Sequence, residues 1–173
     1  FAIFRQGEAY TNPVDRTVLG YKAINVGFAQ LEKNGNPATM LVTETTREVL
    51  TGDQLQPSSS AQINTDFVPT NPSYPIRGQI IDVLDGVTQI SQYQIVVIDL
   101  GIMNGIKVGN LMDVYQLGAT ITDPIHHEKV KLPDEHAGQL MVFRVFDRVS
   151  YGIILVATAP IHTLDIVTNP KHS

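Results

Sequence analysis

Apolar and polar residues alternate with a period of two along most of this 173-residue chain, and glycine and proline interrupt the alternation. A period of two is typical of β-strands, because successive side chains of a strand point to opposite faces. The pattern predicts two hairpins, made by residues 139–146 with 150–158 and by residues 23–33 with 38–44. Asp147-Arg148 forms the turn of the first hairpin. The turn of the second contains Asn34-Gly35, a strong hairpin signal because both residues tolerate positive φ.

Three more strands are predicted in the middle of the chain, over residues 78–84, 94–100 and 111–116. Gly101, Gly105 and Gly109 follow the second of these strands at intervals of four, which predicts a compact turn. We expect the apolar residues between these glycines to plug the end of a small barrel. No helical period extends over three turns, and the best candidates are single turns at 46–50 and 103–108. The chain is therefore predicted to be all-β.

The chain also contains an internal repeat. Residues 3–7 match residues 114–118, and Gly27 matches Gly138 at the same offset of 111. After the next turn the offset is 112, which pairs Asp53 with Asp165, so that one added residue in a turn explains the step. A match over some fifty residues indicates a duplicated β module.

We predict two related small modules of barrel or sandwich type, a first at 1–57 and a second at 77–173. Residues 58–76 join them as an extended linker rich in proline and serine. The second copy continues upstream to residue 77, whereas the first begins at Phe1 in the middle of a predicted strand. We therefore expect the first module to be truncated at its amino end, and expect native residues ahead of Phe1.

Composition narrows the classes of partner. The net charge is −5 and the twelve Lys and Arg residues are scattered, which argues against a nucleic-acid partner. The absence of cysteine excludes disulfides, thiolate catalysis and cysteine-ligated zinc. The longest apolar stretches, at 95–100 and 153–159, are much shorter than the roughly 20 residues of a membrane-spanning helix. No membrane span is predicted in this segment.

Residues that could ligate a metal gather in two runs, His126-His127-Glu128 and Asp134-Glu135-His136. A hairpin that folded them together would place His126, His127 and His136 near one zinc or other divalent ion. The alternative is a polar loop that opens at Thr122-Asp123-Pro124 and closes at Ala137-Gly138. Adjacent histidines on an extended chain face opposite sides, so we predict the loop, with no metal and no cofactor.

Catalysis has less support, because the chain contains neither Gly-x-Ser-x-Gly nor His-Glu-x-x-His. We predict that it is not an enzyme. Asp53 and Asp165 recur at turns, where we expect them to bond nearby backbone amides. Five aromatic residues form either a sugar-stacking platform or, as we predict, cross-strand packing: Tyr93, Tyr115, Phe143, Phe146 and Tyr151.

Residues 101–118 and 132–147 resemble the C-terminal region of proteobacterial envelope proteins that carry an N-terminal LysM domain. Ile3-Phe4-Arg5-Gln6-Gly7, Leu19-Gly20-Tyr21 and Gly52-Asp53 are similar to the preceding part of that region. The resemblance implies a peptidoglycan-associated protein in the periplasm or cell envelope of a Gram-negative bacterium, with peptidoglycan bound by a LysM domain outside this chain. Residues 96–115 also resemble the C-terminal β module of an accessory ring protein of the flagellar motor.

From these patterns we expect a non-catalytic envelope scaffold or interaction region whose partners are envelope proteins or further copies of itself. A first alternative is a structural subunit of a flagellar-motor or secretion-system ring, since exposed strands can add edge to edge. A second alternative is a metal-dependent cell-wall hydrolase that uses the histidine-rich loop.

Overall fold

The computed structural model describes residues 1–58, 68–84, 90–122 and 128–171, and the predicted all-β fold is confirmed. The chain divides into two compact units. Unit 1 comprises residues 1–10 and 20–66, and unit 2 comprises residues 11–19 and 67–173. Within the described ranges, no helix is long and apolar enough to cross a membrane.

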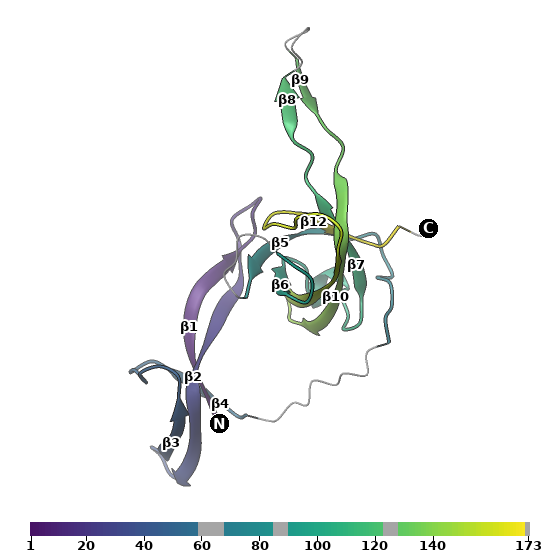
Figure 1. The fold of residues 1–173 in the computed structure, drawn as a ribbon. Helices are drawn as coiled ribbons and strands as arrows, with labels where there is room; N and C mark the ends of the chain where they lie inside the picture. Colours follow the sequence, from purple (N-terminus) through teal and green to yellow (C-terminus); the bar gives the residue numbers. More distant parts are fainter. Residues whose placement is uncertain (59–67, 85–89, 123–127, 172–173) are drawn as a thin grey trace. The chain divides into compact units, whose positions relative to one another are not determined.

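Unit 2 contains a closed barrel of six strands, in the order β10-β11-β6-β5-β12-β7 (Figure 1). All neighbouring strands are antiparallel. The strands are β5 (Arg77–Val83), β6 (Ile95–Ile98), β7 (Leu111–Gln116), β10 (Glu135–Val145), β11 (Ser150–Ala157) and β12 (Ile166–Thr168). The predicted hairpin of residues 139–146 and 150–158 is thus confirmed as β10 and β11. Closure leaves no strand edge open, which removes the usual site of unwanted pairing.

The barrel interior is filled by side chains that the alternation places on its inner face. Ten of them, on all six strands, are fully buried: Ile80, Val96, Ile98, Met112, Val114, Ala137, Leu140, Val142, Ile154 and Val167. Because every strand contributes alternate apolar residues, the barrel encloses a packed core rather than a channel.

The glycine-spaced turn before β7 is compact, as predicted. It contains a 3₁₀ turn, η1 (Ile102–Asn104), and Gly105 and Gly109 have φ of 80° and 89°. The prediction that its apolar residues plug the barrel is right only for Ile106, which is buried in the core. Ile102 and Met103 are exposed, because the 3₁₀ turn directs them outward.

Residues 70–76 of the predicted linker are hydrogen-bonded to the barrel and to the segment after β12. The Thr70 amide donates to the Gly109 carbonyl, and the Leu111 amide donates to the Thr70 carbonyl. The Asn169 side chain accepts from the Ile76 amide and donates to the carbonyls of two residues nearby, Pro72 and Tyr74. Residues 59–67 of the predicted linker lie outside the described residues.

Unit 1 contains a four-stranded sheet in the order β3-β2-β1-β4. Its strands are β1 (Ala2–Thr11), β2 (Val18–Lys33), β3 (Thr39–Thr45) and β4 (Gln54–Gln56), of which the last residue of β1 and the first two of β2 belong to unit 2. The pairing of β2 with β3 confirms the predicted Asn-Gly hairpin. Three buried residues form its small core, Ile3, Val26 and Ala29, with Met40 packed against them.

The sequence repeat corresponds to a repeat in strand pairing. We call two residues equivalent when they are related by the offset of 111, or of 112 after the β2–β3 turn. The order β3-β2-β1-β4 then corresponds to β11-β10-β7-β12 in the barrel. Every residue pair between β2 and β3, and between β1 and β4, recurs at equivalent positions in unit 2, including both register irregularities of β2–β3.

Gly27 and Gly138 explain part of this conserved geometry. Each pairs at the same place in its hairpin, and a Cβ on either one would collide with a backbone carbonyl of the opposite strand, that of Glu44 or that of Val156. Only glycine permits so close an approach of two backbones.

Candidate interaction site

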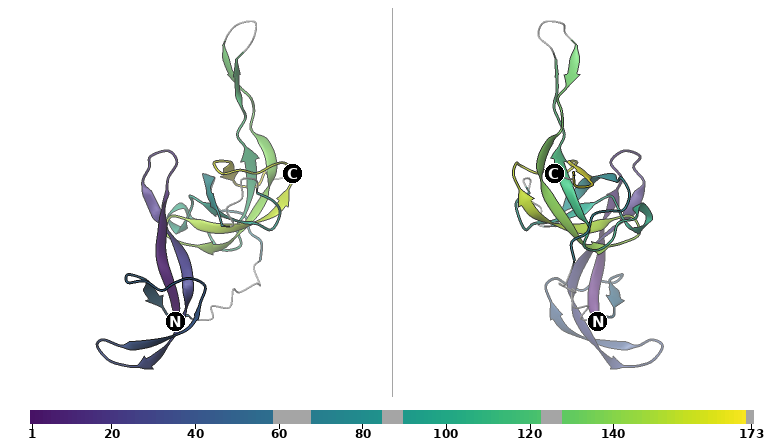
Figure 2. Two further views of the ribbon diagram at one scale, coloured as in Figure 1. Left: turned by 60° about the vertical axis from the view of Figure 1, so that its left-hand side comes forward. Right: turned by 90° about the vertical axis from the view of Figure 1, so that its right-hand side faces the viewer.

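A two-stranded arm projects from one end of the barrel of unit 2 (Figures 1 and 2). It is formed by β8 (Thr120–Thr122) and β9 (Lys129–Lys131), which lie between β7 and β10 in the chain and pair antiparallel. The prediction of a polar loop was wrong here, because strands β8, β9 and the start of β10 lie in the range predicted as loop. Its predicted end at Ala137-Gly138 lies inside β10, because Gly138 serves close strand packing there and not a turn.

The base of the arm is held by Asp134. Its carboxylate accepts a hydrogen bond of 3.1 Å from the Gly118 amide, and Lys131 and Arg77 lie 3.8 and 3.6 Å from its oxygens. The Gly118 amide and these two cations lower the pKa of Asp134. A Cβ at Gly118 would collide with the Leu132 carbonyl, so the two chains of the arm approach closely at this point.

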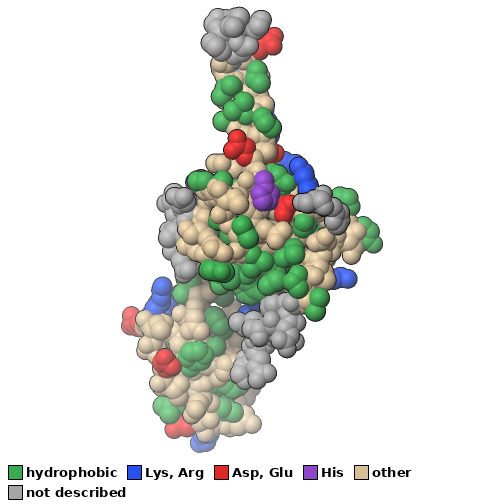
Figure 3. All heavy atoms as spheres, turned by 45° about the vertical axis from the view of Figure 1, so that its right-hand side comes forward, with side chains coloured by type: hydrophobic (Ala, Val, Ile, Leu, Met, Phe, Trp, Pro, Cys, Tyr) green, Lys and Arg blue, Asp and Glu red, His purple; other side chains and the backbone are tan. Residues whose placement is uncertain are grey.

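Apolar side chains are exposed along the arm, and Figure 3 shows them on its surface. Ile121 and Val130 are directly opposite each other in the β8–β9 register and are 46% and 44% exposed. Leu117 and Leu132, nearer the barrel, are also exposed. A two-stranded ribbon has no second layer to cover such residues, so another surface can bury them.

His136 lies where β10 leaves the arm and enters the barrel. Its Nε2 is 3.7 Å from Oδ1 of Asp113, and its ring meets the ring of Tyr115 edge-on at 5.3 Å. His126 and His127, the other candidate ligands, lie outside the described residues. Within the described parts of the chain, no three His, Asp or Glu side chains are grouped so that they could hold a metal ion.

Asp53 and Asp165 both bond turn amides, which confirms their predicted role. Each carboxylate accepts a hydrogen bond of 2.8 Å from the amide three residues earlier, that of Leu50 or that of His162. Arg5 also binds Asp53 with two nitrogens, at 2.8 and 2.9 Å, and this bond lowers the pKa of Asp53 to about 2. Burial instead raises the pKa of Asp165.

Three of the five aromatic candidates pack on one another across β10 and β11, as predicted. The ring of Tyr151 stacks on Phe143 at 6.4 Å and meets Phe146 edge-on at 5.4 Å. Tyr115 contacts His136 and lies 4.8 Å from the Lys171 ammonium, so its neighbours are cationic or polar. Tyr93 is exposed, with a φ of 67°.

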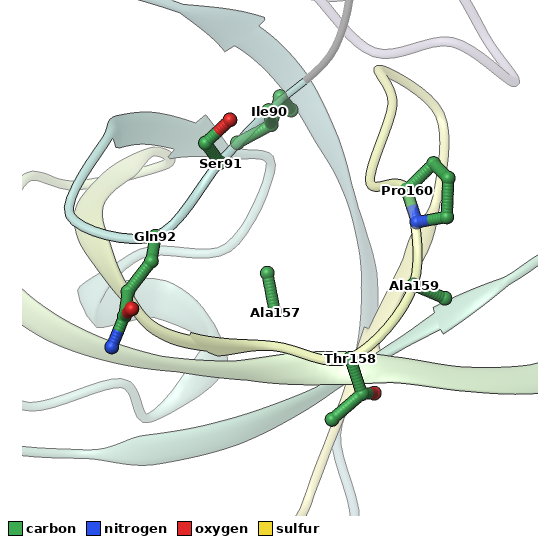
Figure 4. Close-up of a pocket in the computed structure, with 7 residues that line it drawn as sticks. All are labelled: Ile90, Ser91, Gln92, Ala157, Thr158, Ala159 and Pro160. Atoms are coloured by element: carbon green, nitrogen blue, oxygen red, sulfur yellow. The ribbon is translucent and has the colours of Figure 1, made fainter.

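A shallow hollow of about 400 Å³ lies beside the segment before β6 and the end of β11 (Figure 4). All its lining residues are uncharged: Ile90, Ser91, Gln92, Ala157, Thr158, Ala159 and Pro160. The side-chain Nε2 of Gln92 donates to the Leu155 carbonyl, and the Thr158 side chain points away from the hollow in Figure 4. These groups supply hydrogen bonds but no general acid or base.

The arm is the feature that sequence reasoning missed. Its signal was the short alternation Thr120-Ile121-Thr122 and Lys129-Val130-Lys131, which is only three residues long on each side. No protein-family model matches this sequence, and no curated protein matches it either.

Proposed function

We propose that this chain is a non-catalytic scaffold or interaction region of a cell-envelope protein, and that the β8–β9 arm is a contact element. The observation that carries the proposal is the exposed Ile121–Val130 pair on an arm held by a closed, packed barrel. The barrel fixes the base of the arm, and the arm presents apolar surface away from it. Removal of such surface from water against another protein is favourable by about 25 cal/mol per Å², and the entropy cost of association offsets part of this gain.

The resemblance to the C-terminal region of LysM-type envelope proteins supports the location. In this proposal the LysM domain binds peptidoglycan in the periplasm, and the chain described above holds envelope proteins near that anchor. The sparse, scattered Lys and Arg residues fit protein partners better than phosphate-rich ones.

The test is photo-crosslinking in cells from position 130, with position 156 as the matched control. Val130 and Val156 are about equally exposed, at 44% and 45%, but Val156 lies on the barrel strand β11. We expect adducts with an envelope protein or a second copy from position 130 and not from position 156. They should disappear when Ile121 is replaced by Thr. Equal crosslinking from both positions would contradict a specific arm contact.

The ring alternative is favoured by the repeat. Because the strand pairing of unit 1 recurs in unit 2, each copy of the chain carries two unlike versions of one strand arrangement, and a head-to-tail contact between unlike units of neighbouring copies closes into a ring when the rotation between copies permits it. Mass measurement of native particles separates the alternatives: a ring gives one discrete high-copy mass, whereas a tethered scaffold gives the mass of a small complex.

The hydrolase alternative depends on a metal held by His126, His127 and His136, of which only His136 lies among the described residues. It requires stoichiometric zinc in the purified protein, loss of that zinc in His126→Ala, and release of soluble fragments from cell-wall material. If the metal is absent and the cell wall stays intact after zinc is added, this alternative fails.

A further inference from the structure

Unit 1 contains strands at four of the six positions of the barrel. Its strands β3 and β4 are equivalent to β11 and β12, and in the barrel these two strands pair with β6 and β5 respectively. Among the described residues of unit 1, no strand lies in those two positions, so the outer edges of β3 and β4 are both open. One antiparallel hairpin could pair with both free edges, as the β5–β6 hairpin pairs with β12 and β11 in the barrel.

The burial of the core positions also shows that unit 1 lacks cover at the place of β5 and β6. Five equivalent positions are apolar in both units but differ in burial. In unit 2 they are completely buried: Met112, Val142, Ile154, Ile161 and Val167. Their equivalents in unit 1 are 40–48% exposed: Phe1, Leu31, Val42, Val49 and Leu55.

The rest of the core is already formed. Ile3, Val26 and Ala29 are buried, like their equivalents in the barrel, Val114, Ala137 and Leu140. The core of unit 1 is therefore packed where β1 and β2 meet, whereas the apolar residues near the outer edges of β3 and β4 have no strand to cover them. In unit 2 the corresponding space is filled by β5 and β6, whose buried residues include Ile80, Val83, Val96 and Ile98.

We propose that unit 1 closes into a six-stranded barrel by taking up a β-hairpin equivalent to β5–β6, and that this hairpin belongs to the polypeptide ahead of Phe1. The source follows from chain order, because β5 and β6 precede β7 in unit 2 and β1 is the equivalent of β7. The hairpin has apolar residues at alternate positions of both strands, which cover the five exposed side chains.

The backbone at Phe1 fits such an extension. Its nitrogen donates to the Ala29 carbonyl at 2.8 Å, and the Ala29 amide donates to the Phe1 carbonyl at 2.8 Å. This pair is equivalent to Met112–Leu140 in the barrel. A peptide nitrogen at residue 1 can make the same hydrogen bond as the amine, so the strand can continue backward without a change in register.

The test compares amide hydrogen exchange in the chain of residues 1–173 and in the same chain with its native preceding residues. We expect amides of β3 and β4 to exchange at least about tenfold more slowly in the extended protein, because they gain strand partners. Amides of β10 in unit 2 serve as the internal control and keep their rates. Unchanged rates in β3 and β4 would overturn the proposal.

A matched pair of variants in the extended protein tests which face is covered. Val42→Asp places a charge at a predicted core position and should restore fast exchange in β3. Leu41→Asp is the control, because Leu41 is 54% exposed, neighbours Val42 on the opposite face of the strand, and should leave the slow rates unchanged. Equal effects of the two variants would contradict closure.

Hydrogen exchange measured at several protein concentrations tests which polypeptide supplies the hairpin. If protection of β3 and β4 in residues 1–173 rises with protein concentration, a second copy is the occupant and our assignment is wrong. Protection that appears only in the extended protein, at every concentration, supports it. The outcome is independent of the proposed function, since crosslinking from the β8–β9 arm does not involve unit 1.

Discussion

Asp53 and Asp165 show how equivalent residues acquire opposite properties. Both accept the amide of the residue three positions earlier. Asp53 also forms an ion pair with Arg5, whereas the residue equivalent to Arg5 in unit 2 is Gln116, which carries no charge. An arginine favours the ionised carboxylate and burial disfavours it, which explains why the pKa of Asp53 is lowered and that of Asp165 raised.

The first prediction concerns pH. Because the folded-state pKa of Asp53 is about 2, below the usual value of about 3.9, its contribution to stability is present above about pH 4 and is lost as the pH falls toward 2. Arg5→Gln should lower the stability of unit 1 at pH 7 and flatten its dependence between pH 4 and 2. Urea unfolding across this range measures both, with Arg47→Gln as a surface control.

The contribution of Asp165 to stability should depend on pH in the opposite direction. Its raised pKa means that the folded state favours the protonated carboxyl, so stability falls as the pH rises through that pKa. Asp165→Asn keeps an oxygen that accepts the His162 amide and should remove this loss. If the variant shows the same pH slope as the parent, burial is not the dominant effect at this carboxyl.

The third prediction compares alanine substitutions at two glycines, Gly138 and Gly20. Gly138→Ala places a Cβ against the Val156 carbonyl and should destabilise unit 2 by about 1–3 kcal/mol. Gly20→Ala in unit 1 is the control for an added methyl group in open space, because no atom lies within 4 Å of a Cβ at Gly20, and it should change the stability of unit 1 by less than about 0.5 kcal/mol. Chemical denaturation followed by circular dichroism compares the two. A stable Gly138→Ala variant would count against the close strand approach.

Among the elements of unit 2, the two strands of the arm are exposed at every residue. Two strands of three residues are too short to be stable alone, so the arm depends on its base, where Asp134 binds Gly118. The closed barrel and this carboxylate both hold the base of the ribbon.

We therefore expect Asp134→Ala to loosen the arm. The Leu132 amide, which donates to the Ala119 carbonyl, should exchange with solvent roughly fivefold faster. Asp134→Asn retains an oxygen that can accept the Gly118 amide and should have a smaller effect. Hydrogen exchange measures both variants, and an unchanged rate in Asp134→Ala would show that other contacts hold the arm.

At the scale of the whole molecule, each unit has its own buried cluster. Leu140 lies at the centre of the larger one and is fully buried. Leu140→Ala should destabilise unit 2 by about 2–5 kcal/mol through lost burial and the cavity that it leaves. The control is Val156→Ala on the outside of the same barrel.

The measurement is urea unfolding with hydrogen exchange resolved along the chain. Because the two clusters are separate, the loss in Leu140→Ala should be confined to amides of unit 2, and the exchange rates of residues 2–10 and 20–33 in unit 1 should stay as in the parent. Equal losses in both units would mean that they unfold as one cooperative body.

The extent to which sequence predicts this fold differs from feature to feature. The Gln139–Phe146 and Ser150–Thr158 strands and the Asn34-Gly35 turn were predictable because alternation and turn chemistry are local signals. The arm was not, since three-residue strands give too short a period and Gly138 resembles a turn residue. The aspartates were predictable from turn chemistry, whereas the position of His136 beside Asp113 depends on how β7 and β10 pair.

Alternation and the internal repeat are enough to establish that this protein is built of β-strands and that one pattern of strands occurs twice. Which apolar residues are buried depends on the folded arrangement of those strands. Leu31 and Val142 are equivalent and both apolar, yet one is 48% exposed and the other completely buried. The reason is that alternation fixes the face on which a side chain lies, whereas burial requires strands from elsewhere in the chain to cover that face.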